Sequence, residues 1–100
     1  MIKIKNLSKE KPKEPWDVKI CRTKSILGNP YILYNESERD LVCDMYEKWF
    51  DENILMLKDE LQRLIEIYKT YHQLNLFCWC APKRCHGETI KKYIEQEMNK

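Results

Sequence analysis

Residues 76–87, LFCWCAPKRCHG, decide how this chain folds. An apolar run from Leu74 to Trp79 leads into the stretch, and the following residues, GETIKKYIEQEM, have the periodicity of a helix. The order strand, tight loop, helix is typical of α/β folds, which hold ligands at the carboxyl ends of their strands. The first N–H groups of such a helix lack intrahelical partners and favour an anion. Lys83 and Arg84 would add positive charge at the same place.

The remaining elements can be read outward from this stretch. Residues 1–15 predict a short strand of alternating isoleucines and lysines, then a charged loop broken by two prolines. Residues 17–21, DVKIC, predict a second strand. Two helices should follow, separated by Asp51–Asn53. Their predicted apolar stripes are Leu41, Val42, Met45, Tyr46, Trp49 and Phe50 in the first, and Leu57, Leu61, Leu64, Ile65 and Tyr68 in the second.

The last helix should begin near residues 85–88 and bury Ile90, Tyr93, Ile94 and Met98. Strands connected through helices favour parallel pairing. We therefore expect residues 1–100 to form a single α/β domain. Its small, mostly parallel sheet should have about three or four strands, packed with about three helices.

The overall composition excludes several classes of protein. A net charge of +2 gives no general nucleic-acid-binding surface. No apolar run approaches the roughly 18 residues of a membrane span, and the first fifteen residues lack a secretory signal. We expect a cytoplasmic protein. Its five cysteines are then expected to be reduced, with Cys43 buried in the first helix.

A second candidate loop, RTKSILGNPY, follows the second predicted strand at residues 22–31. One interpretation is a simple turn at Gly28–Pro30. The functional interpretation is a loop that offers Arg22, Lys24, Ser25 and backbone amides to a ligand.

Three chemistries compete for the cysteine loop. The first is zinc binding by Cys78, Cys80, Cys85 and His86, although Cys78 and Cys80 on one strand should point to opposite faces. The second is nucleophilic catalysis by Cys85 with His86, because neighbouring positive charge lowers a thiol pKa. The third is ligand binding without chemistry or cofactor, with Trp79 or Tyr31 as a stacking face. A purely structural role for the thiols and His86 also remains open.

The two motifs together resemble a family of small bacterial and phage proteins described only as a domain of unknown function. That family's pattern is a strand ending in an arginine, a GNP-aromatic turn, two helices, and CxCxPxxCHG opening a helix. The resemblance covers roughly Val18 to Ile94. The matching positions are Arg22, Gly28, Asn29, Pro30, Tyr31, Cys80, Pro82, Cys85, His86 and Gly87. Cys21 stands where the family pattern has a small residue such as glycine.

The resemblance implies that the two loops act as a pair at the carboxyl ends of neighbouring strands. The resulting hypothesis is non-catalytic binding of a small anionic or nucleotide-like ligand. By analogy, a phage protein of this kind would lie in the host cytoplasm and sequester a nucleotide immune signal, an anti-defence role. We also expect a homo-oligomer. The expected ligand-binding residues are Arg22, Lys24, Ser25, Gly28, Asn29, Pro30, Tyr31, Trp79, Cys80, Pro82, Lys83, Arg84, Cys85, His86 and Gly87. The alternatives are a cysteine-dependent enzyme for a nucleotide or phosphorylated substrate, and a small zinc-binding domain.

Overall fold

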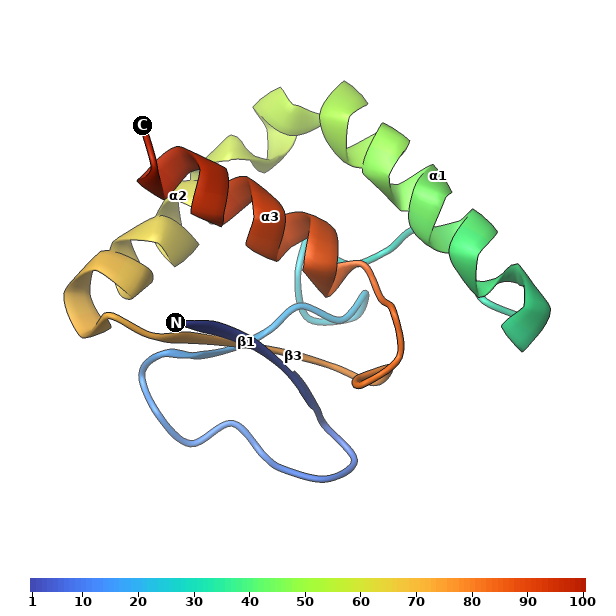
Figure 1. Ribbon diagram of the computed structural model, residues 1–100, viewed down its shortest axis with the longest axis horizontal. Helices are drawn as coiled ribbons and strands as arrows, with labels where there is room; N and C mark the ends of the chain where they lie inside the picture. The colour runs from blue at the N-terminus through green and yellow to red at the C-terminus, as the bar shows by residue number, and fades with distance from the viewer.

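A sheet of three parallel strands, in the order β1-β3-β2, organises the fold (Figure 1). The computed structural model describes all residues from 1 to 100. The elements in chain order are β1 (Ile2–Asn6), β2 (Asp17–Lys19), the 3-10 turn η1 (Glu36–Glu38), α1 (Arg39–Glu52), α2 (Ile54–Tyr71), β3 (Leu74–Cys78) and α3 (Gly87–Met98). The predicted small α/β fold with a parallel sheet and three helices is therefore confirmed.

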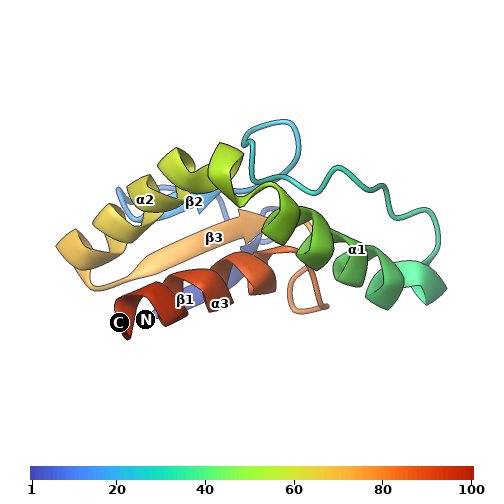
Figure 2. The same ribbon diagram turned by 90° about the horizontal axis from the view of Figure 1, so that it is seen from above.

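The central strand, β3, is buried along its whole length. Side chains alternate between the two faces of a strand. Leu74, Leu76 and Cys78 belong to the hydrophobic core, which the helices cover from one side of the sheet (Figures 1 and 2). Asn75 and Phe77 are buried on the other face. This double burial explains why β3 reads as an apolar run rather than as an alternating pattern.

The core also shows where the expected helix stripes were right. Cys43, Tyr46 and Phe50 of α1 are buried, as are all the leucines predicted for α2 and both isoleucines predicted for α3. The prediction that Leu41, Met45 and Met98 are buried was wrong, since all three are exposed. The first half of α1 projects past the end of the sheet (Figure 2). Its apolar stripe is therefore only partly covered by other elements. Met98 lies in the last turn of α3.

Two further details position the loops. β2 ends at Lys19, two residues before the predicted end, although the N–H of Ile20 still donates to the carbonyl oxygen of Phe77. α1 is preceded by Asn35, whose side chain accepts a hydrogen bond from the N–H of Ser37. None of the helices combines the length and apolarity needed to cross a bilayer.

Candidate functional site

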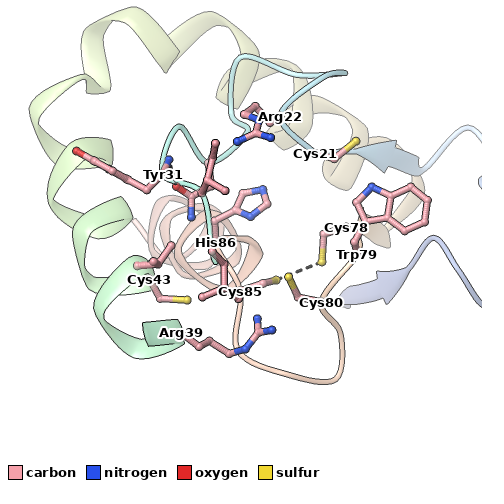
Figure 3. Close-up of a pocket in the computed structure, with 14 residues that line it drawn as sticks. Cys21, Arg22, Tyr31, Arg39, Cys43, Cys78, Trp79, Cys80, Cys85 and His86 are labelled. Carbon is pink, nitrogen blue, oxygen red and sulfur yellow. Dashed lines mark hydrogen bonds between the residues drawn. The ribbon is translucent and has the colours of Figure 1, made fainter. Parts of the chain in front are cut away.

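Both motif loops begin at the same edge of the sheet, because β2 and β3 are parallel neighbours. Residues 20–35 leave β2 there, and residues 79–86 connect β3 to α3. A cavity of about 310 Å³ lies between these loops and α1 (Figure 3). It is lined by Cys21, Arg22, Asn29, Tyr31, Ile32, Leu33, Arg39, Val42, Cys43, Cys78, Trp79, Cys80, Cys85 and His86.

Seven of the fifteen expected ligand-binding residues line this cavity: Arg22, Asn29, Tyr31, Trp79, Cys80, Cys85 and His86. The other eight do not line it: Lys24, Ser25, Gly28, Pro30, Pro82, Lys83, Arg84 and Gly87. The two loops therefore share one cavity, but about half of the expected residues serve to shape the loops or lie elsewhere.

In the first loop, the residues outside the cavity set the course of the backbone. The N–H groups of Lys24 and Ser25 donate to the carbonyl oxygen of Cys21, and the Ser25 hydroxyl accepts from the N–H of Leu27. A Cβ atom at Gly28 would lie 2.2 Å from the Cα of Arg22. Gly28 is thus required by close backbone approach, and this approach places Arg22 at the cavity.

Arg22 and Lys24 are the exposed basic residues of this loop, and of the two only Arg22 lines the cavity. The Arg22 side chain has no ion pair or hydrogen bond to the protein. Its guanidinium lies at one side of the cavity, opposite Arg39 (Figure 3). Asn29 accepts a hydrogen bond from the N–H of Tyr31 through its side-chain oxygen. That turn sets the course of the backbone at Tyr31, which also lines the cavity.

The positive charge of the second loop is directed toward α1 instead of the cavity. Arg84 forms ion pairs with Asp40 at 3.0 Å and Asp44 at 2.8 Å, and Lys83 lies 3.4 Å from Glu36. These pairs fasten the loop to the start of α1. Lys83 and Arg84 are consequently engaged by protein carboxylates.

Arg39 is a cavity residue that the sequence analysis missed. Its guanidinium donates to the Glu36 carboxylate and, at 2.8 Å, to the carbonyl oxygen of Arg84. Its side chain is mostly buried, and hydrogen bonding to Glu36 raises its pKa. The sequence carries no signal for this role, since an arginine at the start of an amphipathic helix is usually solvated.

Three thiols meet beside Arg39. The sulfur atoms of Cys78 and Cys85 are 3.2 Å apart, and hydrogen bonding to Cys78 raises the pKa of Cys80. The expectation that Cys78 and Cys80 point to opposite faces was wrong, because residues two apart on a strand share a face. The strand β3 itself ends at Cys78, so Cys80 belongs to the loop. Cys85 is a buried thiol, and burial alone would raise its pKa. The hydrogen bond with Cys78 outweighs this effect and lowers the pKa of Cys85.

His86 is buried at the base of the cavity. Its Nε2 atom donates to the carbonyl oxygen of Ile20 at 2.7 Å, and its ring packs edge-on against Tyr46 with centroids 5.2 Å apart. Burial lowers its pKa, although the bond to Ile20 opposes that effect. His86 is therefore a neutral imidazole that joins α3 to the end of β2.

The start of α3 differs from the expected anion site. The N–H of Cys85 donates to the Glu88 carboxylate at 3.2 Å, and the N–H of Glu88 donates to the carbonyl oxygen of Cys85. The neighbouring backbone at Gly87 also helps to lower the pKa of the Cys85 thiol. The N–H groups of Cys85 and Glu88 therefore already have protein acceptors.

The four residues considered as zinc ligands are Cys78, Cys80, Cys85 and His86. No group of three or more His, Cys, Asp or Glu side chains is arranged to hold a metal ion. The bond from His86 to the Ile20 carbonyl directs the imidazole away from the thiols. The arrangement instead offers an apolar cavity with two guanidinium groups.

Comparison with known proteins gives a family and nothing finer. Residues 4–96 match the family described as Domain of unknown function (DUF4326), so the chain belongs to that family. No curated protein matches the chain, and no solved structure matches it.

Proposed function

We propose that this member of the DUF4326 family binds a small anionic, nucleotide-like ligand in the cavity between its two loops, without chemical conversion. The observation that carries the proposal is an unpaired guanidinium, Arg22, at the wall of a mostly apolar cavity. Arginine binds phosphate with two parallel hydrogen bonds, a geometry that lysine lacks. The basic residues of the second loop, Lys83 and Arg84, are by contrast already engaged by carboxylates.

The lining of the cavity supports a flat organic group beside the anion. Small-molecule sites are typically concave and apolar, with a few polar groups that set orientation. Tyr31 and Trp79 supply aromatic faces, and Val42 and Ile32 supply aliphatic ones. A volume of about 310 Å³ lies at the lower end of the usual range for such sites and suits one nucleotide.

Binding without turnover suits a protein that sequesters its ligand. His86 uses its Nε2 proton on the Ile20 carbonyl, so this nitrogen is not a free general base. Sequestration of a nucleotide immune signal by a phage protein in the host cytoplasm is one role that such binding would serve.

Mass spectrometry of small molecules released from protein purified out of cells would identify the ligand. We expect an unmodified nucleotide, and titration calorimetry with that compound should then give its affinity. Arg22→Ala should weaken binding on the order of tenfold to a hundredfold, because a shielded charge-assisted hydrogen bond contributes roughly 1.5–3 kcal/mol. Arg22→Lys should restore only part of the affinity.

Lys48→Ala is the matched control, since it removes one exposed positive charge from α1 outside the cavity. It should leave affinity unchanged, and both alanine variants should keep the wild-type melting temperature. If Arg22→Ala bound as tightly as the wild type, Arg22 and the two-loop site would be removed from this proposal.

A thiol-dependent reaction is the second candidate, favoured by the contact between Cys78 and Cys85. That contact lowers the pKa of Cys85, a cavity residue, and a lower pKa raises the fraction of nucleophilic thiolate. This candidate predicts turnover of the identified ligand and its loss on alkylation of Cys85. Binding without turnover, insensitive to alkylation, would favour the first candidate.

A further inference from the structure

A second hollow lies next to the cavity, at the same end of the sheet. Its volume is about 390 Å³, and it shares two wall residues, Cys21 and Trp79, with the cavity. Figure 3 shows these two side chains beside one another at the ends of the strands. We call it the lysine hollow, and it is lined by Leu7, Lys11, Pro12, Lys19, Cys21, Thr23, Lys24 and Trp79.

The charge of the lysine hollow is of one sign. Lys11, Lys19 and Lys24 come from three different segments, and none of them forms an ion pair. No aspartate or glutamate lines either this hollow or the cavity. The hollow beside α3 is different, because its lysines are accompanied by Glu88 and Glu95. Three unpaired ammonium groups around one concave surface favour a multiply charged anion.

We propose that the lysine hollow binds the further phosphate groups of the ligand, so that the ligand is a nucleoside di- or triphosphate rather than a monophosphate. This inference rests on the proposed function. The nucleoside and its first phosphate occupy the cavity, where Arg22 can bind that phosphate in a fixed orientation. The remaining phosphates pass the exposed Trp79 ring, which is 62% accessible, into the hollow.

Lysine is suited to this part of the ligand. Its ammonium group is a point charge on a flexible stem, so it can follow terminal phosphates whose position varies with chain length. Each exposed charge contact contributes little on its own. Three contacts together should strengthen binding on the order of tenfold, and salt should reduce the gain.

The test is calorimetric titration with AMP, GMP, CMP and UMP and with the four corresponding triphosphates, in EDTA so that no divalent cation neutralises the phosphates. We expect one triphosphate to bind about tenfold or more tightly than its monophosphate. The triple variant Lys11→Gln, Lys19→Gln, Lys24→Gln should lose this difference while keeping the affinity for the monophosphate. A matched variant, Lys48→Gln, Lys58→Gln, Lys92→Gln, removes three exposed charges elsewhere and should keep the difference.

Inorganic tripolyphosphate separates the contribution of the phosphates from that of the nucleoside. It should bind at least tenfold more weakly than the best triphosphate, because it leaves the cavity empty. Equal affinity for monophosphate and triphosphate would overturn the proposal that the lysine hollow binds the further phosphates. The proposed function would still stand in that case if Arg22→Ala weakened the binding of both nucleotides. If none of the eight nucleotides bound, the proposed function would fail together with this inference.

Discussion

At the scale of single residues, Gly28 controls the geometry of the first loop. A Cβ atom there would lie 2.2 Å from the Cα and 2.6 Å from the backbone nitrogen of Arg22. The φ angle of Gly28 is not positive, so its backbone conformation is open to other residues. Glycine is required here because a side chain would collide with the backbone of Arg22. Backbone atoms cannot move aside as a side chain can, and the loop must shift to admit a methyl group.

Gly28→Ala should therefore lower the free energy of unfolding by about 1–3 kcal/mol, the usual range for overpacking. Urea unfolding would measure this loss. Gly87→Ala is the matched control, because its added Cβ would meet side-chain atoms and no backbone: the Cδ1 of Ile20 at 3.0 Å, and the Sγ of Cys85 and Cγ2 of Ile4 at 3.4 Å. The better helix propensity of alanine should offset part of that contact. Equal losses in the two variants would contradict the role assigned to the Arg22 backbone.

The buried imidazole of His86 makes stability depend on pH. Its folded-state pKa lies below the ordinary 6.5, so as the pH falls through 6.5 the unfolded chain takes up a proton that the folded chain does not. Stability should therefore decrease between pH 7 and pH 5. The carboxylate of Glu36, whose pKa Arg39 lowers to about 2, contributes a pH dependence only below about pH 4.5.

Urea unfolding at pH 7, 6 and 5 would measure this slope. His86→Gln keeps a donor for the Ile20 carbonyl but cannot be protonated, so its slope should be shallower. His72→Gln changes an exposed histidine and should retain the wild-type slope. An unchanged slope in His86→Gln would show that other groups cause the pH dependence.

At the scale of elements, a strand-end side chain fastens the cysteine loop. The Asn6 amide nitrogen, at the end of β1, donates to the carbonyl oxygens of Ala81 at 2.7 Å and Trp79 at 3.3 Å. Its oxygen accepts from the N–H and hydroxyl of Ser8. The loop is thus held between β1 on one side and the acidic start of α1 on the other.

Asn6→Ala should release the β1 side of this loop. We expect faster hydrogen exchange at residues 79–84 and a loss of about 1–3 kcal/mol in stability, because the Ala81 carbonyl loses its partner. Ser8→Ala removes one hydroxyl but keeps both bonds from Asn6 to the loop, so its exchange there should match the wild type. Unchanged exchange in Asn6→Ala would mean that the ion pairs with α1 hold the loop alone.

The periodicity of the sequence predicted the strands and helices better than it predicted which of their side chains are buried. It identified the three strands and three helices, because burial of β3 and of the helix stripes leaves a direct pattern in the sequence. It failed for Leu41 and Met45, whose exposure depends on how far α1 extends past the sheet. The expectation for Cys80 failed for another reason, because the two-residue spacing from Cys78 predicts the same face and not the opposite one.

At the scale of the whole molecule, the sequence was enough to locate the site. It could not show which basic residues face the cavity and which pair with carboxylates of the protein. Strand, loop, helix order was enough to place Arg22 and His86 at one edge of the sheet. Arg84 looked equally available, yet it pairs with two aspartates some forty residues earlier in the chain. Arg39 reaches the cavity only because η1 and α1 return to that edge. Such long-range pairing leaves no local pattern.

Ligand binding should have a large effect on the stability of a 100-residue chain. A ligand at a hundred times its dissociation constant stabilises the folded state by about 2.7 kcal/mol. In a domain of this size, each kcal/mol shifts the melting temperature by about 4–8 °C. The tightest-binding nucleotide should then raise the melting temperature by about 10–20 °C, as a thermal-shift titration would show.

The same titration on Arg22→Ala tests whether this stabilisation comes from the cavity. If the variant binds tenfold to a hundredfold more weakly, the same ligand concentration is only about one to ten times its dissociation constant. The stabilisation then falls to about 0.4–1.4 kcal/mol, and the shift to about 2–11 °C. Lys48→Ala should keep the full shift. An equal shift in Arg22→Ala would mean that Arg22 does not contribute to nucleotide affinity, because stabilisation by binding depends only on the ligand concentration and the dissociation constant.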